Sequence, residues 1–200
     1  MSNTTTLTKK IEYSKEKKEV RLYRGGKDDC TLINALQEEY PGLKKASDIE
    51  DRKYGIDAIY TDNGEVTTIQ LKTSSQRTLI YEIDKSYDYN ELCKITDFNQ
   101  GKDTKSKADV FLYYIPKDNT FYIIPHSILK EIAIDYVKKM LKEKNLKYKG
   151  LYGTCHIIRD PEKHYYKIVF HGIPYNFWNH HRDDVKRISV PKKLDLHCLK

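Results

Sequence analysis

The sequence predicts a mixed α/β (α+β) domain in which a mixed β-sheet is flanked by helices. Three observations lead to this fold class. Apolar and polar residues alternate in paired runs that are separated by turn residues, as in 55–72 and 108–125. Apolar residues recur at helical spacing in 30–40 and 127–144. The two patterns follow one another along 200 residues, which is the length of one domain or of one domain with an appendage.

The individual elements follow from local signals. The helix expected over 30–40 begins after Gly25-Gly26 and is ended by Pro41-Gly42. Asn63-Gly64 between apolar runs predicts a two-residue hairpin turn, because such turns need positive φ at both positions. The remaining expectations are a helix near 87–96 in an otherwise polar stretch 74–108, a hairpin over 108–125, a helix capped by Ser127, and a hairpin over 154–170.

Composition restricts the class of protein. No apolar run approaches the roughly 20 residues that a membrane span needs, and the first 18 residues lack the apolar centre of a signal peptide. The four cysteines lie far apart without a C-x-x-C pair, so we expect a cytoplasmic protein without disulfides. A formal net charge of +7 permits a polyanionic partner.

The charges are unevenly distributed. Residues 1–27 carry eight basic and three acidic side chains, whereas residues 28–65 carry four basic and ten acidic ones. The acidic segment is either a solvated loop or a cation site on a protein that otherwise favours phosphate. We expect a basic N-terminal extension (1–27), a core domain (28–148) and a C-terminal appendage (149–200).

The first hairpin brings chemically useful groups together. With a two-residue loop at 63–64, Asp57 faces Gln70, and Lys72 lies on the same side of the hairpin. A carboxylate and an amide oxygen are ligands that Mg²⁺ accepts, and an adjacent ammonium group can stabilise phosphate charge. The alternative is an ordinary surface hairpin with polar cross-strand pairs.

These residues resemble a known motif. Gly55-Ile56-Asp57, followed after twelve residues by Gln70-Leu71-Lys72, resembles the PD-(D/E)XK nuclease motif in its Q-x-K form, found in Mrr-like restriction nucleases and small homing endonucleases. The resemblance implies a restriction-endonuclease-like αβββαβ core over 28–148, with a β-hairpin and helix in 149–200 that serve DNA binding or dimerisation. It also implies a Mg²⁺-dependent endonuclease on double-stranded DNA, with Mn²⁺ as a substitute, acting as a homodimer or higher oligomer.

The resemblance also assigns roles to residues. Asp57 and Gln70 would be catalytic metal ligands, Leu71 would offer its backbone carbonyl, and Lys72 would act on water and phosphate charge. Two departures are Ile56 in place of proline and Gln70 in place of an acid. Families with the second change use a Glu from the first helix, for which Glu39 is the candidate. Leu32, Leu36 and Glu39 are spaced i, i+4 and i+7, so we expect Glu39 on the inward face of that helix. Glu39 is otherwise a surface charge, with Glu50 and Asp51 as the fallback acids.

Other residues suggest contacts with DNA. Ser74, Ser75 and Arg77 follow the motif directly and form a small, polar, basic segment suited to phosphates, or else a simple loop. Arg182 is a further phosphate candidate. The aromatic residues in this C-terminal stretch either stack on bases or pack together: Tyr175, Phe177 and Trp178.

The predicted function is a restriction-type or homing-type endonuclease, and the sequence does not choose between these roles. A Holliday-junction-resolving nuclease is a weaker alternative. The alternative from another class is a non-cleaving nucleic-acid-binding protein that keeps the fold and lost activity when the acid became Gln70.

Overall fold

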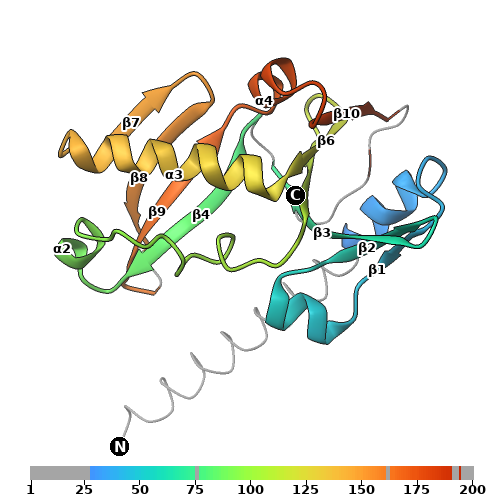
Figure 1. The fold of residues 1–200 in the computed structure, drawn as a ribbon, viewed down its shortest axis with the longest axis horizontal. Coiled ribbons are helices and arrows are strands. Elements are labelled where there is room, and N and C mark those ends of the chain that lie inside the picture. The colour runs from blue at the N-terminus through green and yellow to red at the C-terminus, as the bar shows by residue number, and fades with distance from the viewer. Residues whose placement is uncertain (1–27, 75–76, 161–162, 191–193, 195–200) are drawn as a thin grey trace, which may run out of the picture.

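A computed structural model describes residues 28–74, 77–160, 163–190 and 194. The strands of this part of the chain form two sheets (Figure 1). The first has six strands in the order β1-β2-β3-β5-β6-β10, and only the pairing of β3 with β5 is parallel. The second is antiparallel, in the order β4-β9-β8-β7. The predicted α+β class with a mixed sheet is confirmed.

The elements have the following bounds. The first sheet contains β1 (Leu43–Lys45), β2 (Ala58–Asp62), β3 (Glu65–Thr73), β5 (Val110–Ile115), β6 (Thr120–Pro125) and β10 (Lys186–Ser189). The second contains β4 (Leu79–Ser86), β7 (Lys147–Gly150), β8 (Gly153–Arg159) and β9 (Tyr166–Gly172). The helices are residues 28–36, the π-helix η1 (Glu50–Tyr54), α2 (Tyr89–Leu92), α3 (His126–Lys142) and α4 (Pro174–His180).

The hairpin β2–β3 has the predicted turn. Asn63 and Gly64 have φ of 48° and 86°, the left-handed values that a two-residue hairpin turn needs. Asp62 faces Glu65 and Ala58 faces Ile69, as the predicted register requires. The hairpins β5–β6 and β8–β9 and the long helix α3 also occur where they were expected, although α3 begins at His126 with no side-chain cap, so the capping role of Ser127 was wrong.

The strand β4 was not predicted. Buried Leu79, Tyr81 and Ile83 alternate with the more exposed Ile80 and Glu82. This is a strand pattern within the stretch 74–108 that was expected to be polar. It pairs with β9, so a strand from the range expected for the core domain shares a sheet with one from the C-terminal range.

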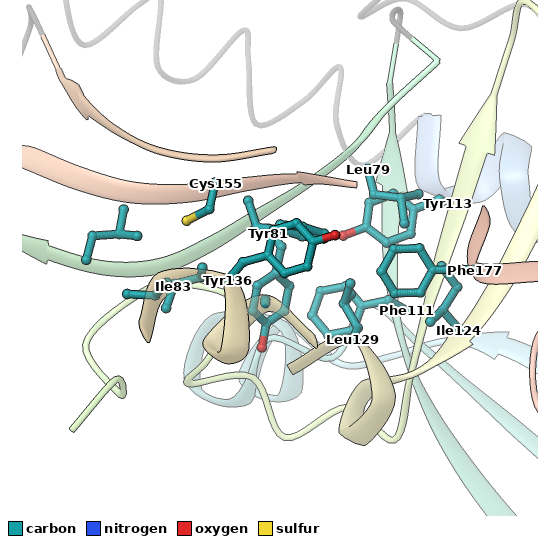
Figure 2. Packing of buried hydrophobic residues seen from close by; sticks show 14 of the residues in the cluster. Leu79, Tyr81, Ile83, Phe111, Tyr113, Ile124, Leu129, Tyr136, Cys155 and Phe177 are labelled. Carbon is teal, nitrogen blue, oxygen red and sulfur yellow. The ribbon is translucent and has the colours of Figure 1, made fainter. Parts of the chain in front are cut away.

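Two apolar cores lie on opposite faces of the first sheet. One, between β5, the second sheet and α3, includes Phe111 and Tyr113 (Figure 2). The other, beneath the first helix, includes Leu112 and Tyr114. Because β5 is buried on both faces, its sequence is a continuous apolar run rather than an alternation. Among the described residues, no helix has the length and apolar character required to cross a membrane.

Candidate metal-dependent active site

Asp57 lies between the end of η1 and the first residue of β2. Gly55, at φ 63°, ends η1 in the left-handed conformation, and the chain then turns into the sheet. The Asp57 amide donates to the Ile69 carbonyl, so Asp57 precedes the regular ladder and does not form the simple pair with Gln70 that was expected. Its carboxylate Oδ2 accepts the Leu71 amide at 2.7 Å, which holds the side chain against β3.

Gln70 is the most unusual polar group of the hairpin. Its side chain is 2% exposed, and its Oε1 atom has no hydrogen-bond partner in the described part of the chain. A buried acceptor without a partner costs about 1–3 kcal/mol. Such a group points to a ligand that completes its coordination, and a cation is one that an amide oxygen accepts.

Lys72 follows Gln70 on the same face of β3. The register pairs Gln70 with Phe111 and Lys72 with Tyr113, whereas Ile69 and Leu71 face the other core. The predicted alternation is therefore confirmed.

The Lys72 ammonium is held by a residue that the sequence did not suggest. Its Nζ atom lies 2.7 Å from Asp103 Oδ1, and the other oxygen of Asp103 accepts the Glu82 amide at 2.8 Å. The Asp103 side chain is 4% exposed and that of Lys72 is 22% exposed. Gly101 permits this arrangement, because a Cβ there would collide with the backbone of β4. The carboxylate of Asp103 thus connects the two sheets beside the candidate site.

The acid of the first helix whose charge interacts with Asp57 is Asp29, not Glu39. The helix ends at Leu36, and Glu39 is exposed in the following turn, so the expectation that Glu39 faces inward was wrong. Asp29 lies three, four and seven residues before the buried Leu32, Ile33 and Leu36, on the inward face. Both Asp28 and Asp29 are within the helix. Extending the apolar stripe of Leu32 and Leu36 by one turn toward the N-terminus would have identified Asp29.

The two carboxyl groups repel one another and are partly desolvated. Burial, followed by the charge of Asp57, raises the pKa of Asp29 to about 7. Burial raises the pKa of Asp57 to about 6, against the Leu71 amide and the ammonium groups of Lys72 and Lys102, which lower it. A bound cation would relieve both effects.

The fallback acids have other surroundings. Glu50 Oε2 accepts the amide and the hydroxyl of Ser47, each at 2.7 Å, and this bonding lowers the pKa of Glu50. Asp51 is exposed, but its charge raises the pKa of Asp57 and of Asp29, so it lies on their side of η1.

The residues predicted to contact DNA differ in their exposure and in their partners. Ser74 is 5% exposed and so is not available to a phosphate, and Ser75 lies outside the described residues. Arg77 pairs with Asp118 at 2.7 Å, and Arg182 is exposed. The Leu71 amide donates to Asp57, and the ligand role of the Leu71 carbonyl stays a prediction.

The donor set suits a hard cation. Among the described residues, no three His, Cys, Asp or Glu side chains gather closely enough to share a metal ion. Two carboxylates with one amide oxygen, supplemented by water, remain as the available ligands, and Mg²⁺ commonly binds through one or two carboxylates while keeping several waters.

Comparisons with known proteins add little to this description. No protein-family model matches the chain, and no curated protein matches it. One solved structure, of the bacterial homing endonuclease I-Ssp6803I, is similar over 70% of this chain and 80% of its own, with 11% identity and a TM-score of 0.37. A similarity at this level does not assign a family.

The raised pKa values predict how the metal-free protein responds to pH. A carboxyl group whose pKa is higher in the folded than in the unfolded chain, where it is about 3.9, stabilises the fold fully below pH 4. That contribution is lost as the pH rises through about 6 for Asp57 and about 7 for Asp29. We therefore expect the free energy of unfolding in EDTA to contain a component that declines from pH 4 to pH 8.

Urea unfolding of Asp29→Asn measures this component. One pKa unit corresponds to about 1.4 kcal/mol, so the variant should be more stable than wild type at pH 8 by at least about 1 kcal/mol and nearly equal at pH 3.5. Asp62→Asn, at the exposed end of β2, is the control and should show no such gain. Equal pH profiles for Asp29→Asn and wild type would contradict the desolvated pair.

Proposed function

We propose that this protein is a metal-dependent DNA endonuclease that hydrolyses phosphodiester bonds in duplex DNA. The observation that carries the proposal is the electrostatic coupling of the charged groups around Asp57. The charge of Asp57 raises the pKa of Asp29, and the Lys72 ammonium lowers the pKa of Asp57. Gln70, two residues before Lys72 on β3, adds a buried amide oxygen without a partner among the described residues. Each of the two carboxyl groups and the amide oxygen lacks a favourable interaction that a cation supplies.

Asp57, Gln70 and Asp29 would hold Mg²⁺, with Mn²⁺ as a substitute. The ion would supply Lewis-acid polarisation of the phosphate and a lower pKa for its bound water. The chain contributes orientation. The Leu71 amide fixes the Asp57 carboxylate, and burial in β3 fixes the Gln70 amide.

Lys72 supplies positive charge to the phosphate. Its ammonium is held by Asp103 at 2.7 Å on one side and is 22% exposed, so part of it remains open to a ligand. A positioned cation stabilises the negative charge that develops on phosphate oxygens during hydrolysis, and it does so more strongly in a partly desolvated site. Because each site cuts one strand, we propose that two copies of the chain cooperate on a duplex.

A plasmid assay with Gln70→Met tests the proposal. Wild-type protein should convert supercoiled plasmid to nicked and linear forms in Mg²⁺ or Mn²⁺ and should be inactive in EDTA. Gln70→Met keeps the volume but removes the amide oxygen, and cleavage should fall about 10²-fold or more, as for loss of one preorganised group. Its thermal stability in EDTA should equal or exceed that of wild type, because a buried acceptor without a partner disappears.

Gln100→Met, at an exposed glutamine, is the matched control and should cut normally. Binding of plasmid without any cleavage in Mg²⁺ or Mn²⁺ would favour the non-cleaving nucleic-acid-binding function instead.

A further inference from the structure

Two arginines stack on the same indole at the C-terminal end of α4. The Arg182 guanidinium carbon lies 4.8 Å from the ring centroid of Trp178, and that of Arg187 lies 5.3 Å from it. The ring of Tyr175, which is 51% exposed, lies 5.5 Å from that of Trp178. Three elements thus contribute to one surface cluster: α4, the turn after it, and β10.

The cluster is held in place from beneath. Phe177, adjacent to Trp178, is fully buried against Tyr152 and Phe170. Val185, in the connection between the two arginines, is 1% exposed, and its amide donates to the His181 carbonyl at 2.7 Å. The backbone that carries the guanidinium groups is therefore anchored in the core, so less side-chain and backbone freedom is lost when a ligand binds.

The guanidinium groups retain unused hydrogen-bonding capacity. Both arginines are exposed, and neither has a carboxylate within ion-pair distance among the residues that the structure describes. Arg182 donates to Asn179 Oδ1 at 3.0 Å, which occupies one of its five N–H donors. Guanidinium groups stacked on an aromatic ring still present their N–H edges outward, and these edges match phosphate oxygens.

The cluster lies on the same side of the first sheet as Lys72. In register across the sheet, Lys72 faces Tyr113, Tyr113 faces Tyr122, and Tyr122 faces Arg187. Directly paired residues share a face, and neighbouring strands are about 4.8 Å apart, so the Cα atoms of Lys72 and Arg187 are separated by about 14 Å. This distance corresponds to about four nucleotide steps along one strand of a duplex.

We propose that Trp178, Arg182 and Arg187 form a phosphate clamp that holds the backbone of duplex DNA beside the candidate active site. The inference rests on the proposed function for its ligand, and it adds the surface that positions the substrate. The clamp binds backbone phosphates without reading bases, so it contributes affinity that depends on salt and hardly on sequence.

Binding of a labelled random-sequence duplex in Ca²⁺, followed by anisotropy at several salt concentrations, tests the clamp in the full-length chain. Each neutralised phosphate contributes about 0.9 to the slope of log K against log salt. Arg182→Gln/Arg187→Gln should reduce the slope by about 2. Lys138→Gln/Lys142→Gln, which removes the same charge from the exposed side of α3, should leave it unchanged.

Trp178 provides a second readout because it is the only tryptophan in the chain. Duplex should change its emission in a salt-dependent manner, whereas inorganic phosphate at the same phosphate concentration should not. Unchanged emission where anisotropy shows binding, or equal slopes for the two double variants, would overturn the clamp.

The outcomes separate the clamp from the proposed function. Mg²⁺-dependent cleavage by wild type together with equal slopes would leave the endonuclease intact and remove only the clamp. A response of Trp178 to inorganic phosphate in a protein that binds no duplex would overturn the assignment to DNA. Loss of cleavage in Gln70→Met does not involve Trp178 and tests the active site alone.

Discussion

Asp57→Asn should abolish Mg²⁺-dependent cleavage of duplex DNA, with a decrease in rate of at least about 10²–10³-fold. The substitution keeps an oxygen that can accept the Leu71 amide, so the local backbone contact survives. It removes the carboxylate that is bound by the Leu71 amide of β3, and with it the anionic ligand that the proposed cation needs. Single-turnover cleavage of a duplex, measured beside binding in Ca²⁺, provides the comparison.

The fold of Asp57→Asn should not suffer. Burial raises the pKa of Asp57 to about 6, which means that its surroundings disfavour the charged carboxylate that is present at pH 8. We expect the melting temperature of the metal-free variant at pH 8 to match or exceed that of wild type. Mg²⁺ should raise the melting temperature of wild type more than that of the variant. Wild-type cleavage by Asp57→Asn would remove this site from the mechanism.

Lys72→Ala should lose both cleavage and stability. The rate should fall by about 10²–10³-fold, because the ammonium no longer stabilises phosphate charge. The fold should lose about 3 kcal/mol, near the low end for breaking a buried ion pair, since Asp103 is left almost fully buried without its cation. Plasmid cleavage and urea unfolding at the same pH measure the two effects.

The double variant Lys72→Ala/Asp103→Asn separates the loss of cleavage from the loss of stability. Neutralising Asp103 removes the unpaired buried charge and should recover most of the lost stability, because an amide oxygen can still accept the Glu82 amide. Cleavage should remain absent. If the double variant cuts DNA at the wild-type rate, Lys72 serves only as the structural partner of Asp103.

The sequence predicted the hairpin well because its determinants are local. Asn63-Gly64 specifies the turn, and the alternation of Ile69 and Leu71 with Gln70 and Lys72 specifies the faces. A slip of one residue would have placed the whole apolar set on the wrong side. Gln70 and Lys72 could therefore be assigned to one face without a structure.

The other site residues depend on distant parts of the chain. Asp103 follows Lys72 by 31 residues in a polar segment without a periodic pattern, and only the docking of β4 brings it to the ammonium. Glu39 was chosen by extending the helical stripe forward, but the helix ends at Leu36, ahead of Pro41-Gly42. Residue spacing shows which residues would share a helix face. The position where the helix ends decides which of them lie on that face.

The contact of Asp103 with both sheets has a consequence for the order of folding. Its carboxylate meets Lys72 only when β4 is in place, and β4 takes its sheet partner from β9, whose residues lie 80 to 93 positions later in the chain. Pairing over such separations closes large loops and is slow compared with local hairpin formation. The β2–β3 hairpin can therefore form early, but its lysine acquires its partner only in a late step. During refolding, secondary structure should return before any catalytic competence.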